Sequence, residues 1–282
     1  MTRFEYDVEW LEANVRIRIA WLTDLHLNFV TKADAERFAL HLATQCPDAV
    51  VISGDVSDGK TVKQHLEALA EAVPCPIYFV LGNHDFYRSS IGFTRARVAG
   101  PLQGRNLHYL TRLGVVQLCP GVALLGHDGW ADGRNGDYAN SEVELNDAYL
   151  IREFKHLRSR WERYQLMEKL ADEAAAHFAV LLPRALVGNT HVIALTHVPP
   201  FAEAAFWQGG PTAPDHLPFF SNRCVGEVLL NVMDHHLDCR LTVLCGHTHE
   251  DGVFNPTPNI EVRSAQAEYG QPRIADILVV GE

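Results

Sequence analysis

Five short groups of metal-binding residue types lie along the chain, each after an apolar run. They are Asp24-Leu25-His26, Gly54-Asp55-Val56-Ser57-Asp58, Gly82-Asn83-His84-Asp85, Thr196-His197 and Gly246-His247-Thr248-His249. Imidazole nitrogens together with carboxylate and amide oxygens suit borderline ions such as Mn, Fe, Zn or Co. Two such ions ~3.5–4 Å apart neutralise phosphoryl oxygens and generate a nucleophilic hydroxide. These residue types therefore favour one dinuclear metal site in a metal-dependent hydrolase.

The elements that must position these groups alternate between strands and helices. Apolar, β-branched runs predict strands at residues 15–22, 49–53, 77–81, 192–196, 241–245, 260–264 and 274–280. Helical patterns lie at residues 33–45, 62–72 and 224–237, and a hairpin is expected from residues 115–118 and 122–126. The repeated order of strand, loop and helix implies parallel strands with the ligand loops at their carboxyl ends. The pattern itself predicts an α/β protein, in which the last two runs close the sheet.

In this order, and spanning Asp24 to His249, the groups resemble the calcineurin-like metallophosphoesterase superfamily, with its D-x-H, G-D-x-x-D, G-N-H-[DE], lone His and G-H-x-H motifs. The resemblance implies a four-layer α-β-β-α sandwich of two mixed sheets with flanking helices, formed by residues 1–282 as a single domain. It also implies two divalent or trivalent ions, Mn, Fe or Zn. The first ion would be held by Asp24, His26 and His249. The second would be held by Asn83, His197 and His247, with Asp55 as the bridging ligand.

By the same resemblance, His84 and Asp85 would be catalytic rather than metal-binding. His84 would contact the phosphate and either protonate the leaving oxygen or stabilise transition-state charge, and Asp85 would fix its tautomer. The alternatives are a structural histidine in a turn for His84 and a helix N-cap for Asp85. Asp58 is either a residue that supports the metal ligands or an ordinary turn residue.

The sequence thus predicts a dinuclear-metal-dependent hydrolase of phosphomonoesters or phosphodiesters, in which a metal-bridging hydroxide attacks phosphorus. The expected substrate is small, with nucleotides among the candidates. Gly59-Lys60 and Asp85 differ from the pattern of serine/threonine protein phosphatases, and Val198 stands where many family phosphodiesterases have a second histidine. The alternatives are a metal-dependent nuclease of the same fold and a non-catalytic scaffold, although no ligand position is missing from the sequence.

Charge and composition limit the partners. The formal net charge of −11 makes nucleic acid an unfavoured partner, because binding to phosphate backbones needs basic surfaces. The six cysteines form no C-x-x-C pairs, which is typical of reduced thiols in an intracellular protein. Residues 1–14 contain no apolar stretch of the kind found in signal peptides. No run in the sequence approaches the ~20 apolar residues that span a membrane. A cytoplasmic protein without membrane contact is expected, and the oligomeric state stays open.

Two irregular segments, residues 128–184 and 199–221, are candidate walls of the cleft or simple surface decoration, and the first looks like a helical and loop insert. Aromatic residues there would either stack on substrate or pack the loops, namely Trp130, Phe201, Phe206 and Trp207. His127 follows a predicted strand and either has a surface or packing role or reaches the cleft. A basic run would meet a substrate phosphate or form a solvated helix face, namely Arg152, Lys155, Arg158, Arg160 and Arg163.

Overall fold

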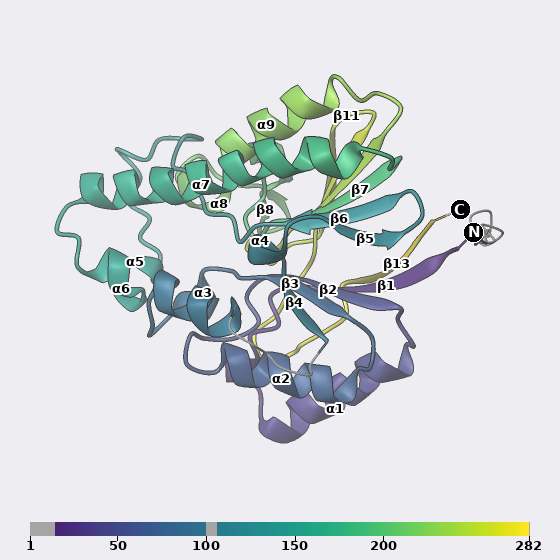
Figure 1. Ribbon diagram of the computed structural model, residues 1–282. Helices are drawn as coiled ribbons and strands as arrows, with labels where there is room; N and C mark the ends of the chain where they lie inside the picture. Colours follow the sequence, from purple (N-terminus) through teal and green to yellow (C-terminus); the bar gives the residue numbers. More distant parts are fainter. Residues whose placement is uncertain (1–14, 100–105, 282) are drawn as a thin grey trace, which may run out of the picture.

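The computed structural model describes residues 15–99 and 106–281. Two large sheets pack face to face, and helices cover the outer face of each, which gives four layers (Figure 1). The predicted α-β-β-α sandwich is therefore confirmed. The organisation of the chain as a single domain with an insert at residues 128–184 stays a prediction.

The first sheet has the strand order β13-β1-β2-β3-β4. Its parallel strands are β1 (Ile17–Leu22), β2 (Ala49–Ser53), β3 (Ile77–Val80) and β4 (Leu107–Tyr109). The last strand, β13 (Asp276–Val280), runs antiparallel to β1, with Val280 opposite Ile17. The expectation that residues 260–264 and 274–280 close one sheet was wrong, because the loop between them crosses from the second sheet to the first. Helices α1 (Lys32–Thr44) and α2 (Val62–Ala72) lie outside the first sheet (Figure 1).

The second sheet has the strand order β11-β12-β10-β7-β6-β5. These strands are β5 (Val116–Cys119), β6 (Val122–Gly126), β7 (His191–Leu195), β10 (Arg240–Leu244), β11 (Gly252–Thr257) and β12 (Ile260–Ser264). The expected hairpin is the antiparallel pair β5 and β6. Helices α7 (Arg160–Leu186) and α9 (Arg223–Met233) cover this sheet. Helix α9 ends earlier than predicted, because the amide groups of His235 and His236 bond three residues back and tighten the chain into a turn.

The buried strands explain the continuous apolar runs in the sequence. Every residue of β2 is buried, because one face of the strand packs against helices and the other against the second sheet. Val50 and Ile52 belong to the cluster beneath α1 and α2, whereas Val51 packs between the sheets. Alternation of side chains along the strand thus assigns each residue to one of the two apolar layers.

The remaining elements are short and lie mostly around one end of the sheets. They are the helices α3 (Ile91–Ala99), α4 (Leu110–Leu113), α5 (Asp147–Leu150), α6 (Arg152–Lys155) and α8 (Leu217–Phe220), the strands β8 (Phe206–Trp207) and β9 (Gly210–Pro211), and the 3-10 turns η2 (Leu27–Phe29), η3 (His84–Phe86) and η4 (Ala202–Ala204). Residues 128–184 supply α5, α6 and most of α7, whose start is fixed by a capping box between Ser159 and Glu162. None of the helices in the described part of the chain has the length and apolarity to cross a membrane.

Candidate metal centre

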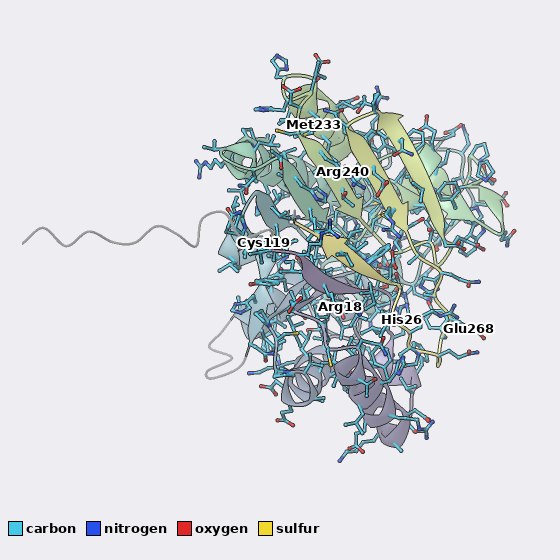
Figure 2. The ribbon with its side chains drawn as sticks, turned by 90° about the vertical axis from the view of Figure 1, so that its right-hand side faces the viewer. Arg18, His26, Cys119, Met233, Arg240 and Glu268 are labelled. Carbon is cyan, nitrogen blue, oxygen red and sulfur yellow. The ribbon has the colours of Figure 1, made fainter. Side chains whose placement is uncertain are left out.

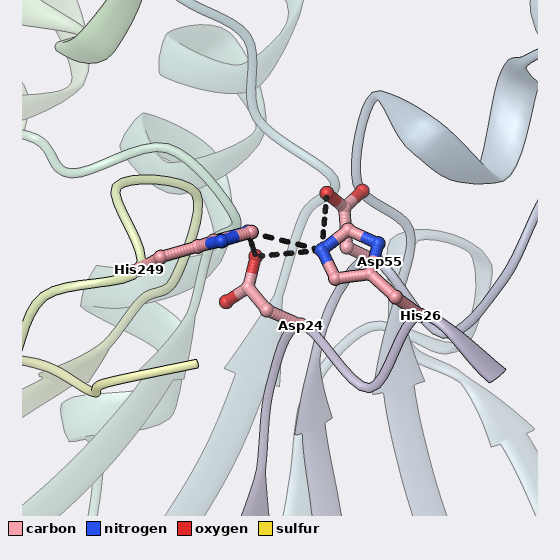
Figure 3. Close-up of side chains that lie close together, drawn as sticks. All are labelled: Asp24, His26, Asp55 and His249. Carbon is pink, nitrogen blue, oxygen red and sulfur yellow. Dashed lines mark hydrogen bonds and ion pairs between the residues drawn. The ribbon is translucent and has the colours of Figure 1, made fainter. Parts of the chain in front are cut away.

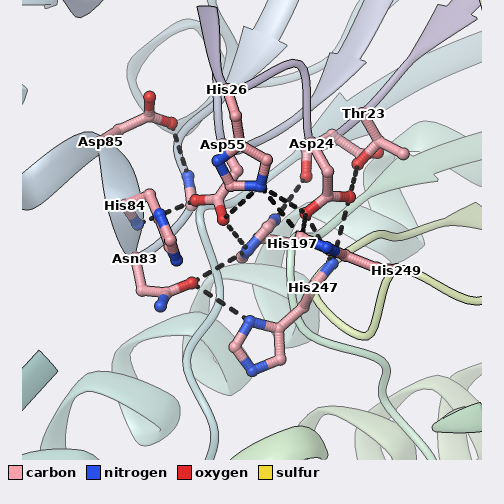
Figure 4. A network of polar contacts seen from close by, with 12 residues as sticks. Thr23, Asp24, His26, Asp55, Asn83, His84, Asp85, His197, His247 and His249 are labelled. Atoms are coloured by element: carbon pink, nitrogen blue, oxygen red, sulfur yellow. Dashed lines mark hydrogen bonds and ion pairs between the residues drawn. The ribbon is translucent and has the colours of Figure 1, made fainter. Parts of the chain in front are cut away.

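All the ligand loops leave the carboxyl ends of parallel strands. Asp24 follows β1, Asp55 follows β2 and Asn83 follows β3 in the first sheet, while His197 and His247 follow β7 and β10 in the second. Figure 2 shows β1 running from Arg18 toward the edge of the molecule where His26 lies. Because both sheets present their carboxyl ends at this edge, the structure brings the predicted ligands together (Figure 4).

A first group of ligand atoms comes from Asp24, His26, Asp55 and His249, all within 4.8 Å of one another (Figure 3). The Nε2 atoms of His26 and His249 are 3.0 Å apart. Nε2 of His249 lies 3.4 Å from Oδ1 of Asp24, and Nε2 of His26 lies 3.8 Å from Oδ2 of Asp55. Four donor atoms of the kinds that transition metals prefer therefore converge on one point.

A second group forms around the side chain of Asn83. Its Oδ1 atom lies 3.1 Å from Nε2 of His197 and 3.1 Å from Nδ1 of His247. Nε2 of His197 is also 3.4 Å from Oδ2 of Asp55. The same carboxylate oxygen of Asp55 thus faces both groups, which is the geometry that a bridging ligand requires.

Backbone carbonyl groups set the orientation of two imidazole rings. Nδ1 of His197 lies 3.0 Å from the carbonyl oxygen of Ser53, and Nε2 of His247 lies 2.9 Å from that of Phe219. A carbonyl oxygen only accepts, so each ring donates from that nitrogen and turns the other toward Asn83. His26 differs, because its buried Nδ1 has no hydrogen-bond partner in the described structure.

The ligand loops have unusual backbone conformations. Five of the predicted ligands have positive φ angles between 43° and 74°, namely Asp24, His26, Asp55, His247 and His249. This left-handed region is uncommon for residues other than glycine, and such strain concentrates at functional sites. Gly82 is needed for a different reason, because a Cβ atom there would overlap Oδ1 of Asp55.

The electrostatics of the centre are those of buried carboxylates facing imidazoles. Burial favours the neutral form of Asp24, but the hydrogen bond and charge of His249 outweigh it and lower the pKa of the carboxyl group. Burial likewise opposes the charged forms of Asp55 and His197, yet their attraction lowers the pKa of Asp55 well below its usual value and raises the pKa of His197 to about 10. Burial lowers the pKa of His26 and of His247 to about 4. His26 and His247 are therefore neutral donors beside ionised carboxylates, whereas His197, with its raised pKa, must release a proton to bind a cation.

His84 and Asp85 are placed differently from each other. The His84 ring stacks on Tyr87 with ring centroids 4.2 Å apart and lies 4.6 Å from the His26 ring. The two carboxylate oxygens of Asp85 accept hydrogen bonds from the backbone N–H groups of Ser57 and Gly82, at 2.8 and 2.9 Å. Figure 4 shows this carboxyl group turned away from the His84 ring.

The expected action of Asp85 on the His84 tautomer is therefore corrected. Asp85 instead joins the loops after β2 and β3. Burial, together with the charge of Asp55, raises the pKa of Asp85 to about 8. A buried acid in contact with backbone amides holds those loops in register beneath the ligands that they carry.

Three residues near the centre were not found from the sequence, because none lies in a recognisable motif. Asp147 in α5 accepts hydrogen bonds at Oδ1 from Nδ2 of Asn83 and from the hydroxyl of Tyr87, both at 2.8 Å. Tyr269, in the loop before β13, has its ring centroid 4.5 Å from that of His26. The only available signal for Tyr87 was its position just after the third ligand group.

Two other predicted residues have structural roles. Oδ1 of Asp58 accepts hydrogen bonds from the backbone of Lys60 and Thr61, and Oδ2 pairs with Arg88 at 2.6 Å, so the turn interpretation of Asp58 holds. Nε2 of His127 lies 3.7 Å from Glu173. The buried ring of His127 points toward α7, which agrees with the packing alternative and not with a position in the cleft.

The predicted aromatic walls mostly pack the loops. Trp130 is only 4% exposed and stacks on Phe154 at 5.4 Å, so it belongs to the core. Trp207 contacts Phe220 at 5.1 Å, and Phe220 in turn contacts His247 at 5.3 Å. The other two also pack within the protein, Phe201 against Phe254 and Phe206 against Gly252.

The basic run divides into two parts. Arg160 lies over the Tyr138 ring at 4.6 Å and donates to the Tyr138 carbonyl, and Arg163 pairs with Glu144 at 3.0 Å. The remaining three side chains are exposed, namely Arg152, Lys155 and Arg158. The solvated-face interpretation fits these positions.

Comparison with known proteins identifies the family of the chain. The family model for calcineurin-like phosphoesterases matches residues 17–251, and the chain belongs to this family. The structure is similar to that of the phosphopantetheinyl hydrolase PptH from Mycobacterium tuberculosis, with a TM-score of 0.63, 13% identity and 91% of each chain covered. It is also similar to a dimetal phosphatase from Danio rerio, with a TM-score of 0.54, 14% identity, and 91% of this chain and 89% of that chain covered. No curated protein matches the sequence.

Proposed function

We propose that the protein is a dinuclear-metal-dependent hydrolase of small phosphomonoesters or phosphodiesters. The observation that carries this proposal is the shared oxygen of Asp55, whose Oδ2 lies 3.8 Å from Nε2 of His26 and 3.4 Å from Nε2 of His197. Family membership supports hydrolysis of a phosphate ester as the reaction. A non-catalytic scaffold fits less well, because each proposed ligand position carries a residue type that can bind a metal ion.

The proposed ligand sets follow the two groups of atoms. Asp24, His26 and His249 would hold one ion, with Asp55 shared. Asn83, His197 and His247 would hold the other. When bound, two transition-metal ions neutralise the phosphoryl oxygens and lower the pKa of a water nucleophile to about 7. Mn, Fe and Zn all suit this mixture of nitrogen and oxygen donors.

His84 is the proposed proton donor to the leaving oxygen, or the group that stabilises charge there. Its backbone N–H donates to Oδ1 of Asp55 at 2.9 Å, and Tyr87 supports one face of its ring. These contacts support a position of the ring beside the proposed ligands, and His84 itself is proposed not to bind metal. Asp85 supports this arrangement indirectly, through the loops that carry Asp55 and Asn83.

The substrate is proposed to be a small phosphate ester, with nucleotides among the candidates and nucleic acid unfavoured by the net charge of −11. We propose a cytoplasmic location, in line with six free cysteines. Segment 128–184 is proposed to support the site through Asp147, which contacts Asn83.

The test is metal reconstitution. Protein stripped of metal would be reloaded with Mn, Fe or Zn and assayed on aryl phosphomonoesters, aryl phosphodiesters, bis-phosphodiesters and cyclic nucleotides. Metal analysis should find up to two ions per chain, and activity should require them. Full activity in exhaustively stripped protein would falsify the proposal.

A further inference from the structure

Tyr269 lies against three imidazole rings of the proposed centre. Its ring centroid is 4.5 Å from that of His26, 5.1 Å from that of His249 and 6.0 Å from that of His84. The side chain nevertheless remains 48% exposed. Tyr269 therefore connects the rings of the proposed centre to the protein surface.

Phe29 extends this aromatic surface away from the centre. Its ring meets that of Tyr269 edge to face, with centroids 5.0 Å apart and planes at 66°. The residue is 56% exposed, although it directly follows the buried ligand loop that carries His26. We call Phe29 and Tyr269 the aromatic pair.

Backbone contacts hold the aromatic pair in place. The N–H of Phe29 donates to the carbonyl of His26, and the N–H of Ala267 donates to the carbonyl of His249. The loop that carries Tyr269 is closed by a hydrogen bond from the N–H of Gln271 to the carbonyl of Glu268. Figure 2 shows Glu268 at the same edge of the molecule as His26. The aromatic pair is thus anchored to two proposed metal-binding segments.

Two exposed aromatic side chains beside a buried polar centre form a surface for a planar group. Stacking on an aromatic ring is tolerant of ring identity, because each planar ring offers a π-face. A phosphate in contact with His84 would direct its ester group past that histidine, toward the Tyr269 ring 6.0 Å away. An aliphatic ester group would gain less binding free energy from this surface, because it offers no flat face for stacking.

We propose that Phe29 and Tyr269 determine specificity by binding an aromatic ring in the ester group of the substrate. This inference rests on the proposed function. A nucleobase and an aryl group share the required chemistry, so the test includes both. Removal of a stacking partner commonly weakens binding by roughly 5- to 150-fold.

The first measurement uses phosphomonoesters or phosphodiesters, whichever class the Mn-loaded wild type hydrolyses. Within that class it compares matched phenyl, nucleoside and glycerol esters. Tyr269→Leu and Phe29→Leu should each reduce the preference for phenyl or nucleoside over glycerol esters, in kcat/KM, by about 10-fold. Tyr269→Phe keeps a ring and should retain the preference. Phe93→Leu is the matched control, because Phe93 is 62% exposed but lies on α3.

The second measurement needs no turnover, which separates this inference from the proposed function. Calorimetry would compare the binding of phenylphosphonate and methylphosphonate to Mn-loaded protein. The wild type should prefer the phenyl compound, and both leucine variants should lose that preference while keeping wild-type metal content. If Tyr269→Leu releases metal, Phe29→Leu decides the question. An unchanged preference for the phenyl compound in Phe29→Leu would overturn the proposal, whether or not the wild type hydrolyses any ester.

Discussion

Nδ2 of Asn83 lies 2.8 Å from Oδ1 of Asp147, which joins a ligand loop of the first sheet to segment 128–184. A carboxylate oxygen accepts hydrogen bonds, so Asp147 holds the amino side of the Asn83 amide. The carbonyl oxygen Oδ1 then points toward His197 and His247. A residue outside every motif thus sets the orientation of a proposed metal ligand.

Asp147→Ala should therefore weaken the second metal site. We expect about 10- to 100-fold lower affinity for one of two ions, because loss of a group that orients a ligand typically has this effect. Titration with Mn, followed by metal analysis, measures the change. Asp147→Asn is the control, because its amide oxygen still accepts from Asn83. Wild-type affinity for both ions in Asp147→Ala would contradict this role of Asp147.

Asp55→Asn should be the most damaging ligand change. An amide oxygen carries no full charge, so both ions are expected to bind more weakly and activity to fall below detection. His197→Ala, by comparison, should affect one ion only. Metal content of the two purified variants provides the comparison, and Asp55→Asn with both metals and near-normal turnover would exclude the bridging role.

His84→Ala should keep its metal but lose turnover by roughly 10²- to 10⁴-fold, the usual contribution of a positioned proton donor. The loss should be smaller for esters with good leaving groups, because these need less help from an acid. Rates for aryl esters of different leaving-group basicity measure this dependence. An equal loss across the series would favour electrostatic stabilisation, and loss of metal would make His84 a ligand.

The fold and the ligand groups could be predicted from the sequence because each depends on local pattern. Buried parallel strands require continuous apolar runs, and ligands at strand ends occur in short motifs such as Gly82-Asn83-His84. Asp147 and Tyr269 could not be found, because long-range packing alone brings them to the centre. Asp85 was predicted to contact its neighbour His84, yet folding places its carboxylate on Ser57, which is distant in sequence.

Trp130 illustrates how packing decides between a core and a cleft role. The side chain is 4% exposed and lies between Phe86 and Phe154. Trp130→Ala should lower the free energy of unfolding by about 3–5 kcal/mol, because it leaves a large cavity. Urea unfolding at fixed metal concentration measures this loss. Trp161, which is 63% exposed, is the control, and Trp161→Ala should cost less than about 1 kcal/mol.

The last prediction concerns pH and the start of β7. Burial, together with the nearby charge of Arg240, lowers the pKa of His191 to about 4. Because an unfolded histidine has a pKa of about 6.5, the unfolded chain binds more protons than the folded chain between these values. The free energy of unfolding should therefore fall as the pH is lowered from about 6.5 to about 4, by at most about 1.4 kcal/mol per pH unit from this group.

His191→Gln should reduce that slope while keeping a polar partner for Thr242, whose Oγ1 lies 3.0 Å from Nε2 of His191. Urea unfolding of both proteins in chelator, at several pH values between 4.5 and 7, isolates the contribution of this residue. All the other histidines, including the proposed metal ligands, are common to both proteins, so their effects cancel in the difference. If the free energies of unfolding of the wild type and His191→Gln change in parallel with pH, proton uptake by His191 does not contribute to the stability change.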